Sequence, residues 1–223
     1  MTFPISLQLR KDQSQENNKR NIKVLNENQS IDWFFYFYRA MAEISDDKEL
    51  LEQFRNESTR EAAYTRIIRK YQEKLYWHIR RMVVEHEDAN DVLQNMFIKV
   101  WRNLANFRED SQLFTWLYRI ATNESLTFLE QKKKRATTSM SKEGYDLSDR
   151  LQADKDFDSK KIEWKLQLAI QGLPEKQRAV FNLRYYDEMP YEEMSRVLDT
   201  SEGALKASYH HAVKKVEDYI LNH

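Results

Sequence analysis

Cysteine is absent from this chain of 223 residues, and glycine and proline occur only three times each. Without cysteine the chain cannot form a disulfide framework, a thiolate zinc site or a thiol nucleophile, and a reducing compartment suits it. Because glycine and proline are scarce and strong helix formers dominate, the composition predicts an all-α protein. No pattern typical of a β-sheet competes with this prediction.

Long apolar runs and an excess of one charge sign are also missing. No stretch reaches the ~18 to 20 apolar residues that a membrane span requires, and residues 1–30 lack the pattern of a secretory signal. The sequence therefore predicts a soluble, cytoplasmic protein. The 36 basic and 36 acidic side chains cancel, so any argument for nucleic-acid binding depends on local patterns.

Motifs for catalysis and metal binding are lacking as well. The sequence shows no Gly-rich phosphate-binding loop, no arrangement typical of a Ser-His-Asp catalytic triad and no pair of carboxylates spaced as a general acid and base. His210 and His211 are adjacent and cannot easily reach one metal ion from a helix, and His78 and His86 lack the HExxH pattern. We therefore predict that the protein is not an enzyme and requires neither a metal nor another cofactor.

Composition and hydrophobic periodicity divide the chain into four parts. Residues 1–30 are polar and are followed by the aromatic segment IDWFFYFYRAM at 31–41. Residues 1–44 therefore form a disordered extension, or residues 1–40 are sequence upstream of a translation start at Met41. Residues 45–135 and 162–223 have helical periodicity and predict two small helical domains. Residues 136–161 are rich in Thr, Ser and Asp and predict a flexible linker between the two domains.

The first domain carries two polar groupings beside its apolar stripe. One stripe runs from Val92 to Leu104 and includes Trp101, which we expect in the core. Asp91, Gln94 and Asn95 lie on another side of that helix and offer hydrogen bonds to a partner. The next helix leaves four side chains on neighbouring faces: Trp116, Arg119, Thr122 and Asn123. An aromatic ring, a guanidinium and small polar groups suit the binding of unstacked bases, although from the residue types alone the favoured interpretation is that Trp116 and Tyr118 complete the core.

The second domain ends in a pattern typical of a helix-turn-helix. A short helix from Tyr191 to Leu198 is followed by a tight break and by a longer helix that begins near Glu202, with Ser201 as its predicted cap. Small, basic and imidazole side chains would then face outward, where they could meet base edges and phosphates: Gly203, Ala204, Lys206, Ala207, His210, His211 and Lys214.

These motifs resemble a known family. Residues 88–135 are similar to region two of bacterial sigma factors of the sigma-70 family, extracytoplasmic-function (ECF) subfamily, through D-x-x-Q at Asp91 and Gln94, NFRED at 106–110 and FTWLYRIATN at 114–123. Residues 163–221 resemble region four through LPEKQRAVFNLRYY and YEEMSRVLDTSEGALKASYHHAVKKV.

The resemblance implies a role in promoter recognition, with core RNA polymerase, promoter DNA and an anti-sigma factor as partners. Asp91, Gln94 and Asn95 would bind the clamp helices of the beta-prime subunit, and the second domain would bind the beta flap. The minus-ten element would be opened and held by the loop and helix that carry Asn106, Phe107, Arg108, Trp116, Arg119, Thr122 and Asn123. The minus-thirty-five element would be read by Ser201 and the outward set on the last helix.

The chain departs from the family pattern at several of these positions. Asn95 stands where relatives often have an acid, Ser208 and His211 stand where arginine is frequent, and Val213 stands where a basic residue is frequent. These departures leave open the strength of the Asn95 contact and the base preference of the last helix. Two other functions compete with the sigma-factor hypothesis: a helix-turn-helix regulator that acts without being a polymerase subunit, and a helical scaffold that does not bind DNA.

Overall fold

A computed structural model describes residues 46–138 and 161–222. The chain divides into two compact units, Met1–Glu49 and Leu50–His223. The predicted extension, residues 1–44, and most of the predicted linker, residues 139–160, lie outside the described residues. Within the described ranges every regular element is a helix, as the composition predicts, and none of these helices is both long and apolar enough to cross a membrane.

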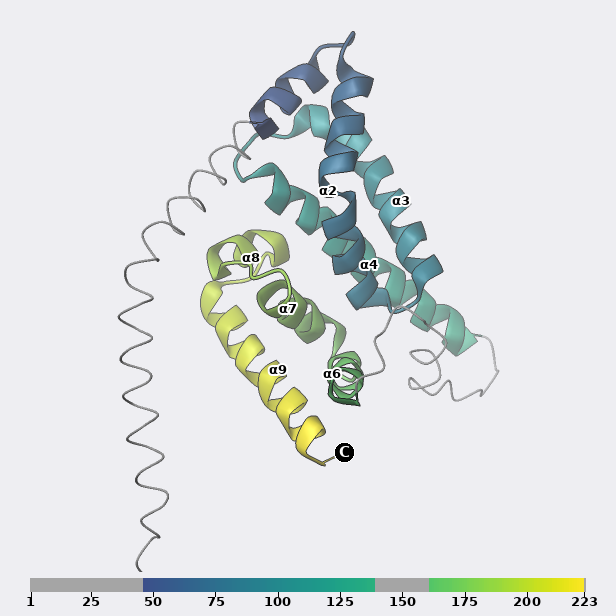
Figure 1. Ribbon diagram of the computed structural model, residues 1–223, viewed down its shortest axis with the longest axis vertical. Coiled ribbons are helices and arrows are strands. Elements are labelled where there is room, and N and C mark those ends of the chain that lie inside the picture. Colours follow the sequence, from purple (N-terminus) through teal and green to yellow (C-terminus); the bar gives the residue numbers. More distant parts are fainter. Residues whose placement is uncertain (1–45, 139–160, 223) are drawn as a thin grey trace, which may run out of the picture. The chain divides into compact units, whose positions relative to one another are not determined.

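The first part of the unit Leu50–His223, here called the first lobe, is a set of three long helices that pack against one another (Figure 1): α2 (Arg60–Val83), α3 (His86–Asn103) and α4 (Leu113–Thr138). A 3-10 turn, η1 (Leu104–Asn106), follows α3. The predicted apolar spacing fills the centre of this lobe. Ile67, Leu75 and Ile79 of α2 and Met96 and Val100 of α3 are completely buried.

Trp101 differs from its prediction as a core residue. Its side chain is 39% exposed, while its neighbour Val100 is fully buried. One residue turns a helix by about 100°, so Val100 takes the centre of the stripe and Trp101 its rim. The indole still packs edge-on against Tyr64, with the ring centroids 4.9 Å apart, and against Phe54, with the centroids 5.4 Å apart.

The second lobe contains four helices: α6 (Lys161–Gln171), α7 (Glu175–Tyr185), α8 (Tyr191–Leu198) and α9 (Glu202–Asn222). The predicted helix-turn-helix is confirmed in α8 and α9. Asp199 ends α8 in the left-handed conformation, with φ of 50°, which allows the sharp turn. The Ser201 hydroxyl then accepts a hydrogen bond from the amide of Ala204 at 3.4 Å, so this residue caps α9 as predicted.

Apolar side chains of both lobes belong to one buried cluster. Leu183 of α7 and Met194 of α8 are in the same cluster as Ile79 of α2 and Leu117 of α4. Helix α4 also continues through the basic run to Thr138, three residues past the predicted end of the first domain at Arg135. In this structure the two lobes therefore share a hydrophobic core.

Candidate nucleic-acid interface

The outer face of α3 presents the residues that the sequence predicts for a protein partner. Asp91, Gln94 and Asn95 are all exposed. Ile98, which the sequence prediction missed, lies on the same face because it is seven residues after Asp91 and four after Gln94, and it is 43% exposed. The face thus combines an acid and two amides with an apolar side chain. The spacing alone could have identified Ile98.

The loop before α4 is only partly accessible. Asn106 and Arg108 are exposed as expected, but Phe107 is 7% exposed. Its ring lies 5.1 Å from the ring of Trp116, between centroids, and it belongs to the core cluster of the lobe. The prediction that Phe107 is available for DNA is therefore wrong for this arrangement, because its apolar ring gains more by packing than by facing water.

Helix α4 separates the predicted minus-ten residues onto two faces. Trp116, Arg119 and Asn123 follow one another at steps of three and four, and the latter two are exposed. Trp116 is half-buried against the core and keeps part of its surface accessible. It therefore acts partly as a core residue, and it still offers part of its ring as a surface on which a base could stack. These three side chains form the accessible grouping of α4.

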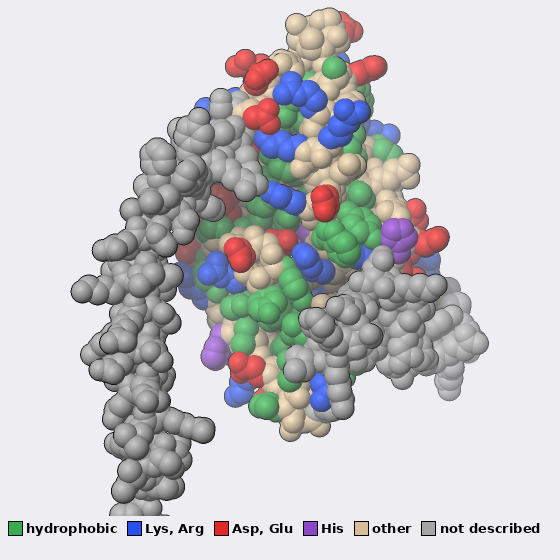
Figure 2. Space-filling view, viewed as in Figure 1, with side chains coloured by type: hydrophobic (Ala, Val, Ile, Leu, Met, Phe, Trp, Pro, Cys, Tyr) green, Lys and Arg blue, Asp and Glu red, His purple; other side chains and the backbone are tan. Residues whose placement is uncertain are grey.

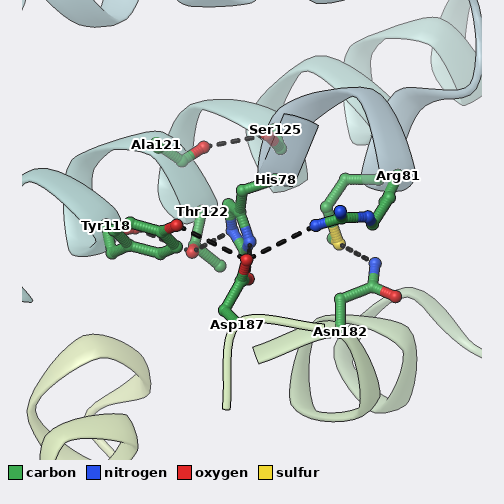
Figure 3. A network of polar contacts seen from close by, with 9 residues as sticks. His78, Arg81, Tyr118, Ala121, Thr122, Ser125, Asn182 and Asp187 are labelled. Atoms are coloured by element: carbon green, nitrogen blue, oxygen red, sulfur yellow. Dashed lines mark hydrogen bonds and ion pairs between the residues drawn. The ribbon is translucent and has the colours of Figure 1, made fainter. Parts of the chain in front are cut away.

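Thr122 is not part of that grouping, and the expectation that it lies on an accessible face is wrong. Its side chain is completely buried. The hydroxyl donates to the carbonyl of Tyr118 at 2.8 Å and lies 2.9 Å from Nε2 of His78 (Figure 3). A buried imidazole needs such a partner, and Thr122 supplies it from α4.

A buried polar cluster surrounds His78, as Figure 3 shows. Nδ1 of His78 lies 2.9 Å from the carboxylate of Asp187, which follows α7. The hydroxyl of Tyr118 donates to the same carboxylate at 3.4 Å. Burial, and then the nearby negative charge of Asp187, raise the pKa of Tyr118 far above its ordinary value, so the phenol stays neutral and remains a donor.

The predicted recognition face of α9 is accessible along its length. All of its predicted contact residues are exposed: Ser201, Gly203, Ala204, Lys206, Ala207, His210, His211 and Lys214. A Cβ atom at Gly203 would meet no atom within 4 Å, which marks an open helix surface. Nζ of Lys206 lies 3.2 Å from the carboxylate of Glu202 and 5.4 Å from the centre of the Tyr191 ring. An acid therefore partly neutralises the lysine at this end of the helix.

Charge on the remaining surface is mixed. Lys and Arg side chains are interspersed with Asp and Glu side chains on the face shown in Figure 2. Residues 91–135 hold eight basic and five acidic side chains, whereas residues 163–223 hold eight basic and ten acidic ones. Long-range attraction to DNA is consequently weak, and selective contacts must come from the particular side chains on α4 and α9.

Comparisons with known proteins agree with this arrangement of two lobes. The family description "Sigma-70 region 2" matches residues 67–135, and "Sigma-70, region 4" matches residues 163–216. The RNA polymerase sigma-H factor of Pseudomonas aeruginosa is 32% identical over 179 residues, which cover 77% of this chain and 92% of that protein. The ECF RNA polymerase sigma-E factor of Haemophilus influenzae is 28% identical over 188 residues, covering 81% and 98%.

Two solved structures have the same fold. The structure of CnrH in complex with the cytosolic domain of CnrY matches with a TM-score of 0.58 and 20% identity, over 78% of this chain and 96% of that one. The sigma factor RpoE in complex with the anti-sigma factor NepR from Bartonella quintana matches with a TM-score of 0.55 and 18% identity, over 71% and 97%. A helical protein with a region-two lobe followed by a region-four lobe is a transcription initiation factor. This chain belongs to the ECF subfamily of the sigma-70 family of RNA polymerase sigma factors.

Proposed function

We propose that this protein binds core RNA polymerase, directs it to specific promoters and assists the opening of the DNA. The observation that carries the proposal is the exposure of the predicted contact faces on α3, α4 and α9, in lobes that match the two sigma-70 regions in order. A regulator that acts without polymerase has no use for the polar face of α3, and a scaffold has no use for the outward face of α9.

Each face has a distinct role in this proposal. Asp91, Gln94 and Asn95 bind the clamp helices of the beta-prime subunit, while the second lobe binds the beta flap. Arg119 and Asn123 hold an unpaired base of the minus-ten element, with Trp116 beside it as a stacking surface, and Asn106 and Arg108 contact the adjoining backbone. The face of α9 reads the minus-thirty-five element from the major groove. An anti-sigma factor is a further proposed partner, because one relative of the same fold was solved with one.

Run-off transcription on fragmented host DNA, with core polymerase and the purified chain, tests this function. We expect a limited set of chain-dependent start sites that share two upstream elements. The regulator alternative predicts DNA fragments that bind the chain without core polymerase, and the scaffold alternative predicts neither transcripts nor bound fragments. Absence of chain-dependent transcripts, together with no copurification of the chain with core polymerase, would contradict the proposal.

Substitutions separate the two activities. Lys206→Ala or His210→Ala should weaken use of the minus-thirty-five element by roughly fivefold to a hundredfold, the loss expected for one good base contact, without changing polymerase binding. Lys215→Ala is the matched control, because Lys215 contacts Gln177 at 2.9 Å instead of belonging to the predicted face. The double substitution of Asp91 and Gln94 by alanine should do the reverse, with Glu73→Ala on α2 as its exposed control. Equal loss of both activities in every variant would contradict the assignment of faces.

A further inference from the structure

Asp187 lies at the place where the second lobe meets α2 and α4 (Figure 3). One carboxylate oxygen is 2.9 Å from Nδ1 of His78, and the other is 3.4 Å from a guanidinium nitrogen of Arg81. The second oxygen also accepts from Tyr118 at 3.4 Å. The side chain of Asp187 is only 7% exposed and that of His78 is fully buried. Three side chains of the first lobe thus converge on one carboxylate of the second.

Other polar contacts join the same two lobes around this centre. They are a hydrogen bond from the Thr115 hydroxyl to the Glu193 carboxylate, one from the Gln171 amide to the Arg81 carbonyl at 3.0 Å, an ion pair between Lys133 and Glu175 at 2.8 Å, and the Arg81 guanidinium 4.3 Å from the centre of the Tyr186 ring. Arg81 therefore forms an ion pair with Asp187 and a cation–π contact with Tyr186.

The closed arrangement is too short for two promoter elements. Elements centred near minus ten and minus thirty-five are separated by about 25 base pairs, or about 85 Å of B-form DNA. Trp116 adjoins Thr115, which is hydrogen-bonded to Glu193, and Ser201 follows Glu193 by eight residues. Even if the chain from Glu193 to Ser201 were fully extended, the start of α9 would lie within about 45 Å of Trp116, well short of the distance between the two elements. The lobes must separate before both elements are bound on straight DNA.

We propose that Asp187 is the hub of an intramolecular latch with His78, Arg81 and Tyr118, which holds the two lobes together and must release before the chain reads a whole promoter. The need to open rests on the proposed function, whereas the latch itself is a property of the free chain. The covalent chain allows the separation, since the 22 residues between α4 and α6 have a fully extended length of about 75 Å.

Burial makes this contact suitable as a latch. The carboxylate is removed from water, so its attraction to Arg81 is screened less, and its contact with Nδ1 of His78 competes less with water, than at an exposed site. Opening returns every partner to water together, so the contacts are made or lost as a set. Asp187→Asn keeps the shape of the side chain and removes its charge, and it should shift the closed-to-open equilibrium by about tenfold toward open.

Distance measurement on the free, full-length chain tests the latch. The natural absence of cysteine allows spin labels at Thr127→Cys on α4 and Glu217→Cys on α9, two exposed positions that are not among the proposed contact residues. We expect one dominant short distance in the parent chain and a larger population of long distances in D187N. E188Q is the control, because Glu188 is the exposed acid next in the chain. If D187N and E188Q give the same distances, or if the parent chain is already mostly open, the latch is overturned.

A milder variant guards against a loss of folding. Tyr118→Phe keeps the packed ring and removes one donor to Asp187, so it should move the distances in the same direction by a smaller amount. Helical circular dichroism and thermal unfolding identify any variant that has lost its fold. If Y118F remains folded and leaves the distances unchanged while D187N unfolds, the latch is also overturned.

Polymerase binding supplies a second readout. Under the proposed function the polymerase-bound chain reaches both promoter elements and is therefore open, so D187N should bind core polymerase with an apparent affinity about tenfold higher than the parent chain, and E188Q should not. Equal affinities despite a shift in distances would overturn the claim that the latch limits binding. A shift in distances with no binding by any variant would support the latch and contradict the proposed function, so the two failures are distinguishable.

Discussion

Tyr64 shows how one side chain fastens two helices of the first lobe. Its hydroxyl, on α2, donates a hydrogen bond to the carbonyl of Phe97 on α3. Burial raises the pKa of this phenol to about 12 from the ordinary value of 10.0. Between pH 10 and about 12 the phenol is therefore mostly neutral in the folded state and mostly charged in the unfolded state.

Alkaline pH should weaken the fold through this residue. The contribution of Tyr64 to the free energy of unfolding is complete below pH 10 and is lost as the pH rises toward about 12, because the unfolded phenol releases its proton first. Tyr64→Phe should cost about 0.5–1.5 kcal/mol at pH 8, the usual value of one hydrogen bond. The difference between the parent and the variant should shrink above pH 10.

Urea unfolding between pH 8 and pH 11 measures this difference. Tyr185→Phe is the matched control, since the ring of Tyr185 is 49% exposed and should leave stability unchanged. A gap between Y64F and the parent that stays constant across the alkaline range would contradict the assignment.

Thr122 and Asn123 illustrate the limit of sequence reasoning for single residues. Periodicity places them on different faces of α4, because one residue turns the helix by about 100°. It cannot identify His78, 44 positions earlier on α2, as the partner that draws Thr122 into the interior. Residues whose environment depends on their own helix were predicted well, as on α9, whereas those that depend on distant elements, such as Phe107 and Thr122, were not.

Helices were largely predictable as elements because their causes are local. The apolar periodicity of α2 and α3, and the break at 199–201 with its Ser201 cap, are properties of neighbouring residues. The structure adds most to the outer face of α3. It adds exposed Ile98 to three polar side chains, and an apolar side chain within a polar rim is typical of a binding anchor.

Replacement of this anchor should weaken polymerase binding. Full burial of such an apolar side chain contributes about 1.5–3 kcal/mol. Because Ile98 is 43% exposed in the free chain, a little under half of this is available at the interface, so we expect Ile98→Ala to lower the affinity for core polymerase by about threefold to tenfold. The helix should remain stable, because the side chain is 43% exposed in the free chain. Binding of fluorescently labelled chain to core polymerase measures the effect.

Leu221→Ala is the control for the α3 substitution. Leu221 is also exposed and apolar, at 83%, but it lies near the end of α9, away from α3. An equal loss in both variants would indicate a general effect of surface hydrophobicity, and no loss in I98A would exclude Ile98 from the interface.

At the scale of the whole molecule, the all-α class followed from composition, but the shared core of the two lobes did not. A polar linker and separate periodic segments are equally compatible with independent lobes and with packed ones. The packing depends on complementary apolar surfaces, which place Leu183 and Met194 in one buried cluster with Ile79 and Leu117 and leave no signal in a single sequence. The polar latch around Asp187 is hidden for the same reason.

Neutral charge also has its consequence at this scale. The second lobe has eight basic and ten acidic side chains in residues 163–223, and Lys206 on its recognition helix is paired with Glu202. Nonspecific affinity for DNA follows the number of phosphates that a protein neutralises, so the free chain should bind duplex DNA weakly and with a shallow salt dependence.

Attachment to core polymerase should convert weak binding into selective binding. The complex holds α9 close to the upstream DNA, and this raises its effective concentration there without any new contact. We therefore expect fluorescence anisotropy with promoter duplexes to detect sequence-specific binding by the holoenzyme and only weak binding by the free chain, at the same physiological salt. D187N alone should not rescue the free chain, because opening the latch adds no phosphate contacts. Tight, specific binding by the free parent chain would show instead that α9 recognises its element without polymerase, and that its local contacts outweigh the unfavourable charge of the lobe.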